Sequence, residues 1–165
     1  MDAAYFGESD AVFSNCGQYR YRLWRKWSDG PSIAFLMLNP STADATKNDP
    51  TVERCHRRAV EMGFGTLEVI NIFAYRATDP KDLKKASEPN GPLNDKTLIE
   101  TAKSCNMIVC AWGSHGTHLN RDKQVRVLLK EASIQTHMLA LTKYDQPRHP
   151  LYISYTQKPV LWSAL

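Results

Sequence analysis

Short apolar runs alternate along this chain with segments in which apolar residues recur at the spacing of a helix. Four of the runs have the length of buried strands and span residues 33–38, 67–73, 107–112 and 136–141. The other segments predict helices over about 50–62, 93–104 and 121–132. Because successive parallel strands need a crossover between them, this alternation predicts a parallel sheet with helices on both faces.

Two of the predicted helices begin with recognisable capping residues. Asp49 precedes Pro50, and an acidic cap followed by proline in the first helical position favours a helix start. Asn120 is the predicted cap of the helix over about 121–132.

A β-hairpin is predicted before the first core strand. Ala11–Phe13 and Gln18–Trp27 flank a turn around Asn15–Gly17. The two faces of the second strand carry Tyr19, Tyr21, Leu23 and Trp27 on one side, and Arg20, Arg22, Trp24 and Lys26 on the other. We therefore expect residues 1–165 to form one domain, a three-layer α/β/α sandwich with a mainly parallel four-stranded sheet and an N-terminal β-hairpin.

Polar side chains follow the end of each predicted core strand. The segments concerned are 39–44, 71–76, 112–116 and 142–150, which together offer amides, imidazoles, cations and aromatic rings. Ligands of parallel α/β sheets bind beyond the carboxyl ends of the strands. We therefore expect Asn39 and Asn71 to line one pocket, with Trp112, His115 and His149 approaching it.

Some of these residues also have a purely structural interpretation. Asn39 to Ser41 suits a turn as well as a binding loop. Phe73, Tyr75 and Trp112 suit core packing as well as stacking on a ligand.

The acidic residues and the potential metal ligands limit the kinds of catalysis that the site can support. Asp44 is interpreted as a turn residue, as a water-activating base or as an acidic residue of the substrate pocket, and Asp49 as a helix cap. His115 and His118 have no obvious third ligand, and no CxxC pair occurs, so no metal and no cofactor are expected.

Composition is typical of a globular protein with no membrane segment. The 165 residues are 42% hydrophobic and 23% charged, with no run of about 18 apolar residues. The chain start lacks the pattern of a signal peptide, so we expect a cytoplasmic monomer with its four cysteines reduced. The formal charge of +4 permits an anionic partner without requiring one.

Five segments resemble a bacterial and phage family known only as domain-of-unknown-function family 1643. They are residues 35–44, 49–55, 71–80, 111–116 and 147–152, and the resemblance extends from Tyr19 to Trp162. The family name implies no activity.

A second, more distant similarity does imply one. A strand followed by Asn-Pro and a small residue, a second strand followed by Asn, and a last loop containing proline resemble the uracil-DNA glycosylase superfamily, especially its mismatch-specific thymine/uracil branch. The resemblance implies that Asn39 positions the attacking water and that Asn71 and Phe73 contact the base. It also implies that Pro147 to Leu151 enter the minor groove and bind phosphate. This last loop departs from the superfamily pattern, which has small residues around the proline, whereas here Leu151 and Tyr152 follow Pro150.

The chemistry of base removal can be considered independently of this resemblance. Hydrolysis of an N-glycosidic bond needs a water on one face of the sugar carbon and stabilisation of the departing base anion on the other. A carboxamide orients water but barely activates it, so an asparagine site depends on leaving-group stabilisation. Arg148 and His149 are candidates for this, and a flipped base also needs an aromatic ring on which to stack.

We therefore expect an enzyme that processes bases in DNA, in the form of a glycosylase-like hydrolase that removes a damaged or modified base. The alternatives are a non-catalytic module that binds nucleic acid or a nucleotide, and a hydrolase of free modified nucleotides. The expected catalytic residues are Asn39, Asp44 and His149. The expected base-binding residues are Pro40, Ser41, Asn71, Phe73, Tyr75, Arg76, Trp112, Gly113 and His115. The expected contacts with the nucleic-acid backbone are Arg20, Arg22, Lys143 and Arg148.

The basic residues lead to a prediction about DNA binding. If Arg20, Arg22, Lys26, Lys143 and Arg148 neutralise phosphates, DNA binding should be weak and should fall as salt is added, because bound counterions are released. Fluorescence anisotropy of a labelled oligonucleotide across a salt titration measures this. Absence of binding at low salt, or binding that salt does not weaken, would contradict a DNA partner.

Overall fold

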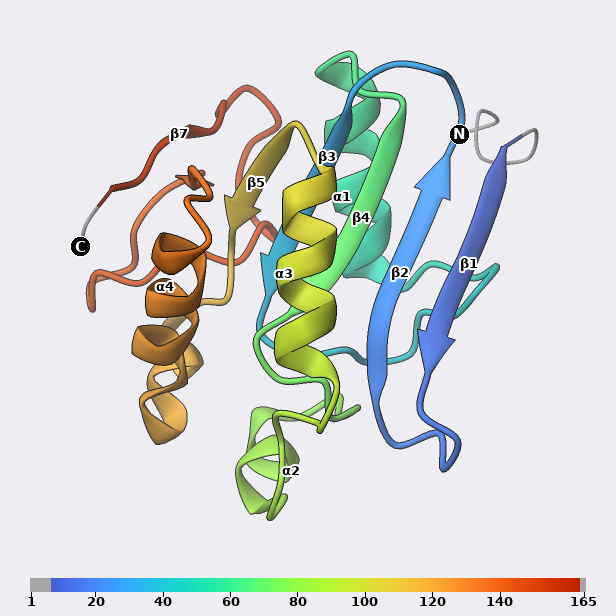
Figure 1. The fold of residues 1–165 in the computed structure, drawn as a ribbon. Helices are drawn as coiled ribbons and strands as arrows, with labels where there is room; N and C mark the ends of the chain where they lie inside the picture. Colours follow the sequence, from blue (N-terminus) through green and yellow to red (C-terminus); the bar gives the residue numbers. More distant parts are fainter. Residues whose placement is uncertain (1–6, 164–165) are drawn as a thin grey trace.

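The structure, a computed structural model, describes residues 7–163 and consists of one sheet with helices on both sides (Figure 1). The strands are β1 (Glu8–Phe13), β2 (Arg20–Lys26), β3 (Ser32–Met37), β4 (Thr66–Asn71), β5 (Met107–Cys110), β6 (His137–Met138) and β7 (Val160–Leu161). The helices are α1 (Pro50–Glu61), α2 (Pro80–Lys85), α3 (Asn94–Ser104), α4 (Arg121–Glu131) and a 3₁₀ segment at Ser114–Asn120. In the described part of the chain, no helix has both the length and the apolar character needed to span a membrane.

The sheet is mixed and has seven strands in the order β1-β2-β4-β3-β5-β6-β7. Strand β3 pairs in parallel with β4 and β5, and β5 with β6, whereas the β1–β2, β2–β4 and β6–β7 pairs are antiparallel. The expected α/β class is therefore confirmed. The expected sheet was too small and too uniformly parallel, because the hairpin β1–β2 continues the sheet next to β4 and β7 adds an unpredicted strand at the other edge.

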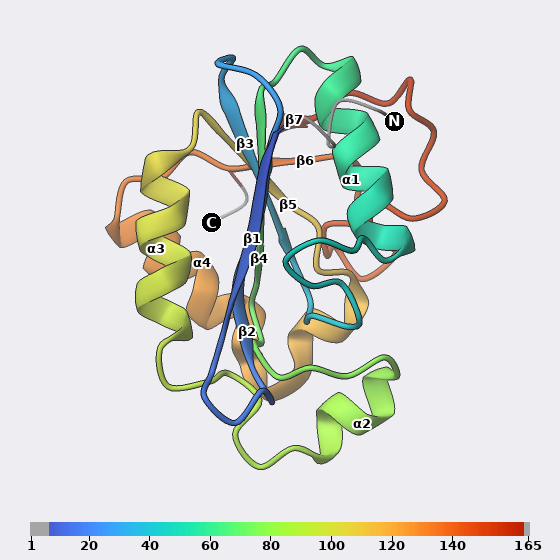
Figure 2. The ribbon, with the colours of Figure 1, turned by 90° about the vertical axis from the view of Figure 1, so that its right-hand side faces the viewer.

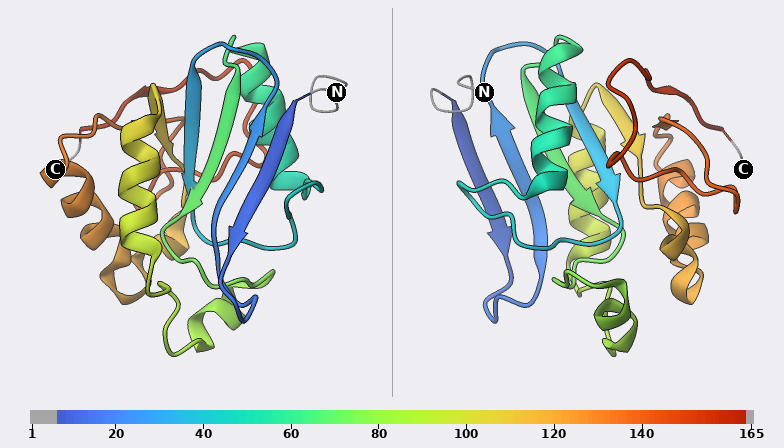
Figure 3. Two further views of the ribbon diagram at one scale, coloured as in Figure 1. Left: turned by 45° about the vertical axis from the view of Figure 1, so that its right-hand side comes forward. Right: turned by 180° about the vertical axis from the view of Figure 1, so that it is seen from behind.

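Helices cover both faces of the sheet (Figure 2). Helix α1 lies on one face, and α3 and α4 lie on the other. The two views of Figure 3 show the same faces in turn, with α3 in front of the sheet on the left and α1 in front of it on the right.

Two apolar clusters, one on each face, share the residues of β3. Ile33 and Phe35 pack with Val52 and Cys55 of α1, and Leu36 packs in the cluster on the opposite face. Side chains of a strand alternate between faces, so a strand buried on both sides has apolar residues at every position. This explains why the sequence of β3 is a continuous apolar run.

Strand β2 differs from the expected strand with one core face and one basic face. It lies between β1 and β4, and the guanidinium groups of Arg20 and Arg25 are buried. The expected basic surface is therefore wrong at Arg20, because its side chain is enclosed beside the carbonyl oxygen of Ala43 and the amide of Asn71.

The predicted caps had different outcomes. Asp49 Oδ1 accepts a hydrogen bond from the Val52 N–H at 2.9 Å and Pro50 begins α1, as predicted. Asn120 has a left-handed backbone and its side chain caps nothing, so that prediction was wrong. Helix α2 was missed, although Asp79 followed by Pro80 repeats the signal that begins α1.

Arginines of α1 hold the segment that follows β6. Arg58 donates to the carbonyl oxygens of Gln157 at 2.8 Å, Ile153 at 3.0 Å and Ser154 at 3.2 Å, and Arg54 donates to that of Pro150 at 3.3 Å. These bonds give the irregular segment the donors that a sheet neighbour would otherwise supply. They fix the last of the four strand-end loops against α1.

The contacts of Arg58 lead to a stability prediction. Arg58→Met should lower the free energy of unfolding by about 1–3 kcal/mol, because the carbonyl oxygens of Gln157 and Ser154 lose their arginine donor and that of Ile153 keeps only Arg54. The matched variant Arg57→Met changes an exposed neighbour on the same helix and should stay within about 0.5 kcal/mol of the parent. Urea denaturation measures both. Equal midpoints for the two variants would contradict this role of Arg58.

Candidate functional site

A cleft of about 630 Å³ opens where the core strands end. Segments that follow β3, β4, β5 and β6 all line it, together with the start of α1. Of the predicted site residues, the cleft brings together Arg20, Asn39, Pro40, Ser41, Asn71, Trp112, Gly113, His115, Arg148 and His149. Its lining does not include Arg22, Asp44, Phe73, Tyr75, Arg76 or Lys143.

The side chain of Asn39 connects two strand-end loops. Its Nδ2 atom donates to the carbonyl oxygens of Ala77 at 2.8 Å and Pro40 at 3.1 Å, with that of Tyr75 at 3.4 Å. Three carbonyl oxygens around one amide atom identify that atom as nitrogen. Among the described residues Oδ1 has no hydrogen-bond partner and is not one of the fully buried unpaired atoms, so it is open to solvent in the cleft.

Asn71 and Arg20 lie deep in the cleft, and each is 2% exposed. Arg20 Nη1 donates to the carbonyl oxygen of Ala43 at 3.1 Å, and Nη2 lies 3.5 Å from Asn71 Oδ1. Arg20 Nε and Asn71 Nδ2 are both buried without an acceptor. Two donors therefore remain unpaired at the floor of the cleft.

The charge of Arg20 is poorly compensated. Burial lowers the pKa of its guanidinium to about 10, although the carboxylate of Asp49 acts in the opposite direction. The group is still protonated at neutral pH, and within residues 7–163 it forms no ion pair.

Asp49 is the carboxylate in the cleft lining, but its oxygens are already engaged. Oδ1 accepts from the Val52 N–H at 2.9 Å and Oδ2 from the Ala43 N–H at 3.3 Å. Asp44, the expected alternative base, lies outside the lining and accepts from the backbone N–H groups of Thr46 and Lys47. These hydrogen bonds lower the pKa of Asp44, as expected of a turn residue.

The two histidines of the cleft differ in their surroundings. His149 Nδ1 accepts from the Leu151 N–H at 3.2 Å, so its Nε2 carries the proton of the neutral ring. Burial lowers the pKa of His149, which favours the neutral form. His115 is exposed, and partial desolvation lowers its pKa. Among the described residues, no group of three or more potential ligands is arranged to hold a metal ion.

The predicted stacking aromatics are mostly enclosed. Trp112 lines the cleft but is buried, and its Nε1 donates to Gln146 Oε1 at 2.8 Å. Phe73 is fully buried in the cluster beneath α3 and α4, and Tyr75 packs against Tyr19. None of these three rings is an exposed side chain with a face open for stacking.

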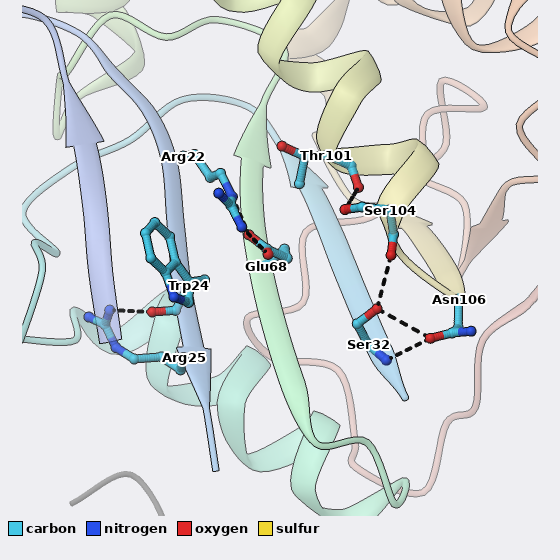
Figure 4. A network of polar contacts seen from close by, with 8 residues as sticks. All are labelled: Arg22, Trp24, Arg25, Ser32, Glu68, Thr101, Ser104 and Asn106. Atoms are coloured by element: carbon cyan, nitrogen blue, oxygen red, sulfur yellow. Dashed lines mark hydrogen bonds and ion pairs between the residues drawn. The ribbon is translucent and has the colours of Figure 1, made fainter. Parts of the chain in front are cut away.

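Two predicted polar contacts have internal partners. Arg22 stacks on Trp24, with its guanidinium carbon 4.3 Å from the ring centroid, and bonds Glu68 through Nε at 2.7 Å and Nη2 at 2.6 Å (Figure 4). Arg76 donates to the Gly17 carbonyl oxygen at 3.0 Å and lies over the ring of Phe13.

The remaining predicted phosphate contacts are exposed on the last strand-end loop. Arg148 lines the cleft, and Lys143 lies over the ring of Tyr144. Among the charged residues of the cleft lining, sequence reasoning missed the floor position of Arg20 and the presence of Asp49. Asp49 was visible only as a cap, and the position of Arg20 depends on the pairing of β2 with β4.

Comparisons with known proteins give one match. The model of the family described as "Protein of unknown function (DUF1643)" matches residues 20–151. Neither the curated proteins nor the solved structures contain a match to the chain.

The contacts of Asn39 lead to a second stability prediction. Asn39→Ala should lower the free energy of unfolding by about 1–3 kcal/mol, because the three carbonyl oxygens lose a shared donor. Asn39→Asp should cost more, since a carboxylate oxygen would replace the donor among those oxygens. Asn15→Ala, in the exposed hairpin turn, is the control and should change little. Thermal and urea denaturation measure all three. An Asn39→Ala protein as stable as the control would contradict the connecting role.

Proposed function

The chain belongs to the DUF1643 family of proteins of unknown function, and since that name assigns no activity, we propose a function from the cleft itself. We propose that the cleft binds a base of DNA and hydrolyses its N-glycosidic bond. The observation that supports this best is the arrangement of Asn39, whose Nδ2 is held by three carbonyl oxygens while Oδ1 is left open to the cleft.

In this reaction Asn39 Oδ1 accepts a hydrogen bond from the attacking water. The water oxygen bonds to the sugar carbon, the electron pair of the carbon–nitrogen bond leaves with the base, and one water proton ends on the base. A carboxamide does not remove that proton in advance, so the barrier depends on how well the protein stabilises the departing base.

Donors for the departing base are available on two sides of the cleft. Neutral His149 has its proton on Nε2 and lines the wall formed by the last loop. The unpaired donors of Arg20 and Asn71 lie at the floor. The volume of about 630 Å³ is within the range of small-ligand sites and leaves room for a base together with its sugar.

The rim of the cleft has features suited to a DNA strand. Leu151 lines the cleft, and the adjacent Tyr152 is 86% exposed with a left-handed backbone (φ 71°). Such a conformation is unfavourable for tyrosine and is seen where the surroundings impose it. An exposed ring beside the cleft can stack on a base or enter the space left by a flipped one. Arg148 and Lys143 lie on the same loop and can contact phosphates.

A second candidate function is a non-catalytic module that binds nucleic acid or a nucleotide. The observation in its favour is that both oxygens of Asp49 accept backbone hydrogen bonds, so among the described residues the lining of the cleft holds no carboxylate free to act as a base. Binding without turnover needs the donors of the cleft but not a base.

Base release distinguishes the two candidates. Oligonucleotides that each contain one modified pyrimidine, single- and double-stranded, should become alkali-labile at that base after incubation with the protein. His149→Ala should slow release by about 100-fold, because it removes the Nε2–H donor to the leaving group. The matched variant His118→Ala changes a half-buried histidine outside the cleft lining and should retain activity.

Two results would contradict the hydrolase. One is the absence of labile sites in the whole panel while the protein still binds the oligonucleotides, which is the result expected of the binding module. The other is equal activity of His149→Ala and His118→Ala, which would separate any observed activity from this cleft.

A further inference from the structure

We infer that Arg20 and Asn71 form a receptor for a compact oxyanion at the floor of the cleft. The inference rests on the proposed function in taking this cleft as the ligand site. It goes further by naming the chemical class of the group that binds at the floor, which is an oxyanion. It also gives Arg20, which the sequence suggested as a phosphate contact on the outer surface, a role in binding that group.

Arg20 is a buried arginine that forms no ion pair with a carboxylate of the described chain. Its side chain is 2% exposed, and its polar contacts are one carbonyl oxygen, that of Ala43, and one long contact to Asn71. Its Nε has no acceptor. A buried charge without a counter-ion is costly, and an anion brought by a ligand would remove much of that cost.

Other arginines of the chain differ in this respect. Arg22 has a bidentate carboxylate partner in Glu68, and Arg121 is paired with Asp95. Arg58 has three carbonyl acceptors. Arg58 and Arg76 also have an unpaired Nε, but Arg20 lines the cleft, and its guanidinium has one carbonyl acceptor where that of Arg58 has three.

Asn71 adds a second donor at the same place. Its Oδ1 faces Arg20 Nη2, which leaves the Nδ2 group for another acceptor, and none is present among the described residues. Asn94 shows the usual alternative, since its buried Nδ2 donates to the carbonyl oxygens of Asn71 at 2.8 Å and Ile72 at 3.2 Å. The floor of the cleft thus combines a charged donor with a neutral one, which suits an oxyanion with at least two acceptor positions.

The neighbouring carboxylate does not supply this anion. Asp49 contributes an attractive charge to Arg20, but its two oxygens accept from Val52 and Ala43, and it forms no ion pair with the guanidinium within the described chain. Two kinds of ligand can provide the missing group. One is the ionised oxo edge of a nucleobase, and the other is a phosphate.

The first test places a carboxylate of the protein itself in the proposed receptor. In Asn71→Asp, a carboxylate takes the place of the amide beside Arg20, so the melting temperature should rise by roughly 3–6 °C in phosphate-free buffer. The matched control is Asn94→Asp, also at a fully buried asparagine, where a carboxylate oxygen would face two carbonyl oxygens and the melting temperature should fall.

Ligand titrations complete the test. Inorganic phosphate, uracil and the more acidic 5-nitrouracil are titrated separately against the parent protein and Asn71→Asp, with the melting temperature as readout. We expect at least one of them to stabilise the parent and none to stabilise Asn71→Asp. Stabilisation by phosphate identifies a phosphate receptor, and stronger stabilisation by 5-nitrouracil than by uracil identifies a receptor for the base anion.

The inference is overturned if Asn71→Asp is destabilised like Asn94→Asp, and equally if no probe stabilises the parent. None of these measurements needs turnover, so the receptor and the hydrolase can fail separately. Base release without any response to the probes would overturn the receptor alone. Stabilisation by a probe without base release would overturn the hydrolase alone.

Discussion

Backbone carbonyl groups that leave the sheet at the carboxyl ends of its strands must find donors, and in this protein side chains supply several of them. Asn39 Nδ2 binds carbonyl oxygens of the loop after β4, and Asn94 Nδ2 binds those of Asn71 and Ile72. Arg25 donates to the carbonyl oxygens of Asp44 at 2.7 Å and Ala45 at 3.2 Å. Because a buried carbonyl without a donor costs as much as a lost hydrogen bond, these side chains determine the paths of the loops that form the cleft.

Because several arginines are buried in this way, the net positive charge of the chain does not by itself indicate a basic surface. A formal charge of +4 on the sequence suggests an anionic surface partner, yet Arg20, Arg25 and Arg58 are buried and donate to carbonyl oxygens. An arginine that organises backbone contributes to the net charge without contributing to a basic face. The proposed contact with DNA therefore depends on exposed residues near the cleft, Lys143 and Arg148 above all.

The grouping of the cleft residues could be predicted from sequence because it follows from topology alone. Once the apolar runs are assigned to parallel strands, Asn39, Asn71 and Trp112 must lie at one edge of the sheet, whatever their side chains do. Which side chains face the cleft could not be predicted. Phe73 follows its strand by two residues and is enclosed by the helices, whereas Arg20 reaches the cleft only because β2 pairs with β4. Such non-local pairing has no signature in local periodicity.

Asn39 shows that structural and chemical roles can belong to one side chain without conflict. The sequence left it open whether this residue forms a turn or positions a water, and the structure gives the turn role to Nδ2 while leaving Oδ1 unused. An amide held by three carbonyl oxygens has lost its rotational freedom during folding. Its free oxygen therefore has a fixed position before any ligand arrives, and a water bound there needs no further ordering of the protein, which is the condition for preorganised catalysis. The loss of stability expected for Asn39→Ala and the proposed role in hydrolysis thus have the same physical origin.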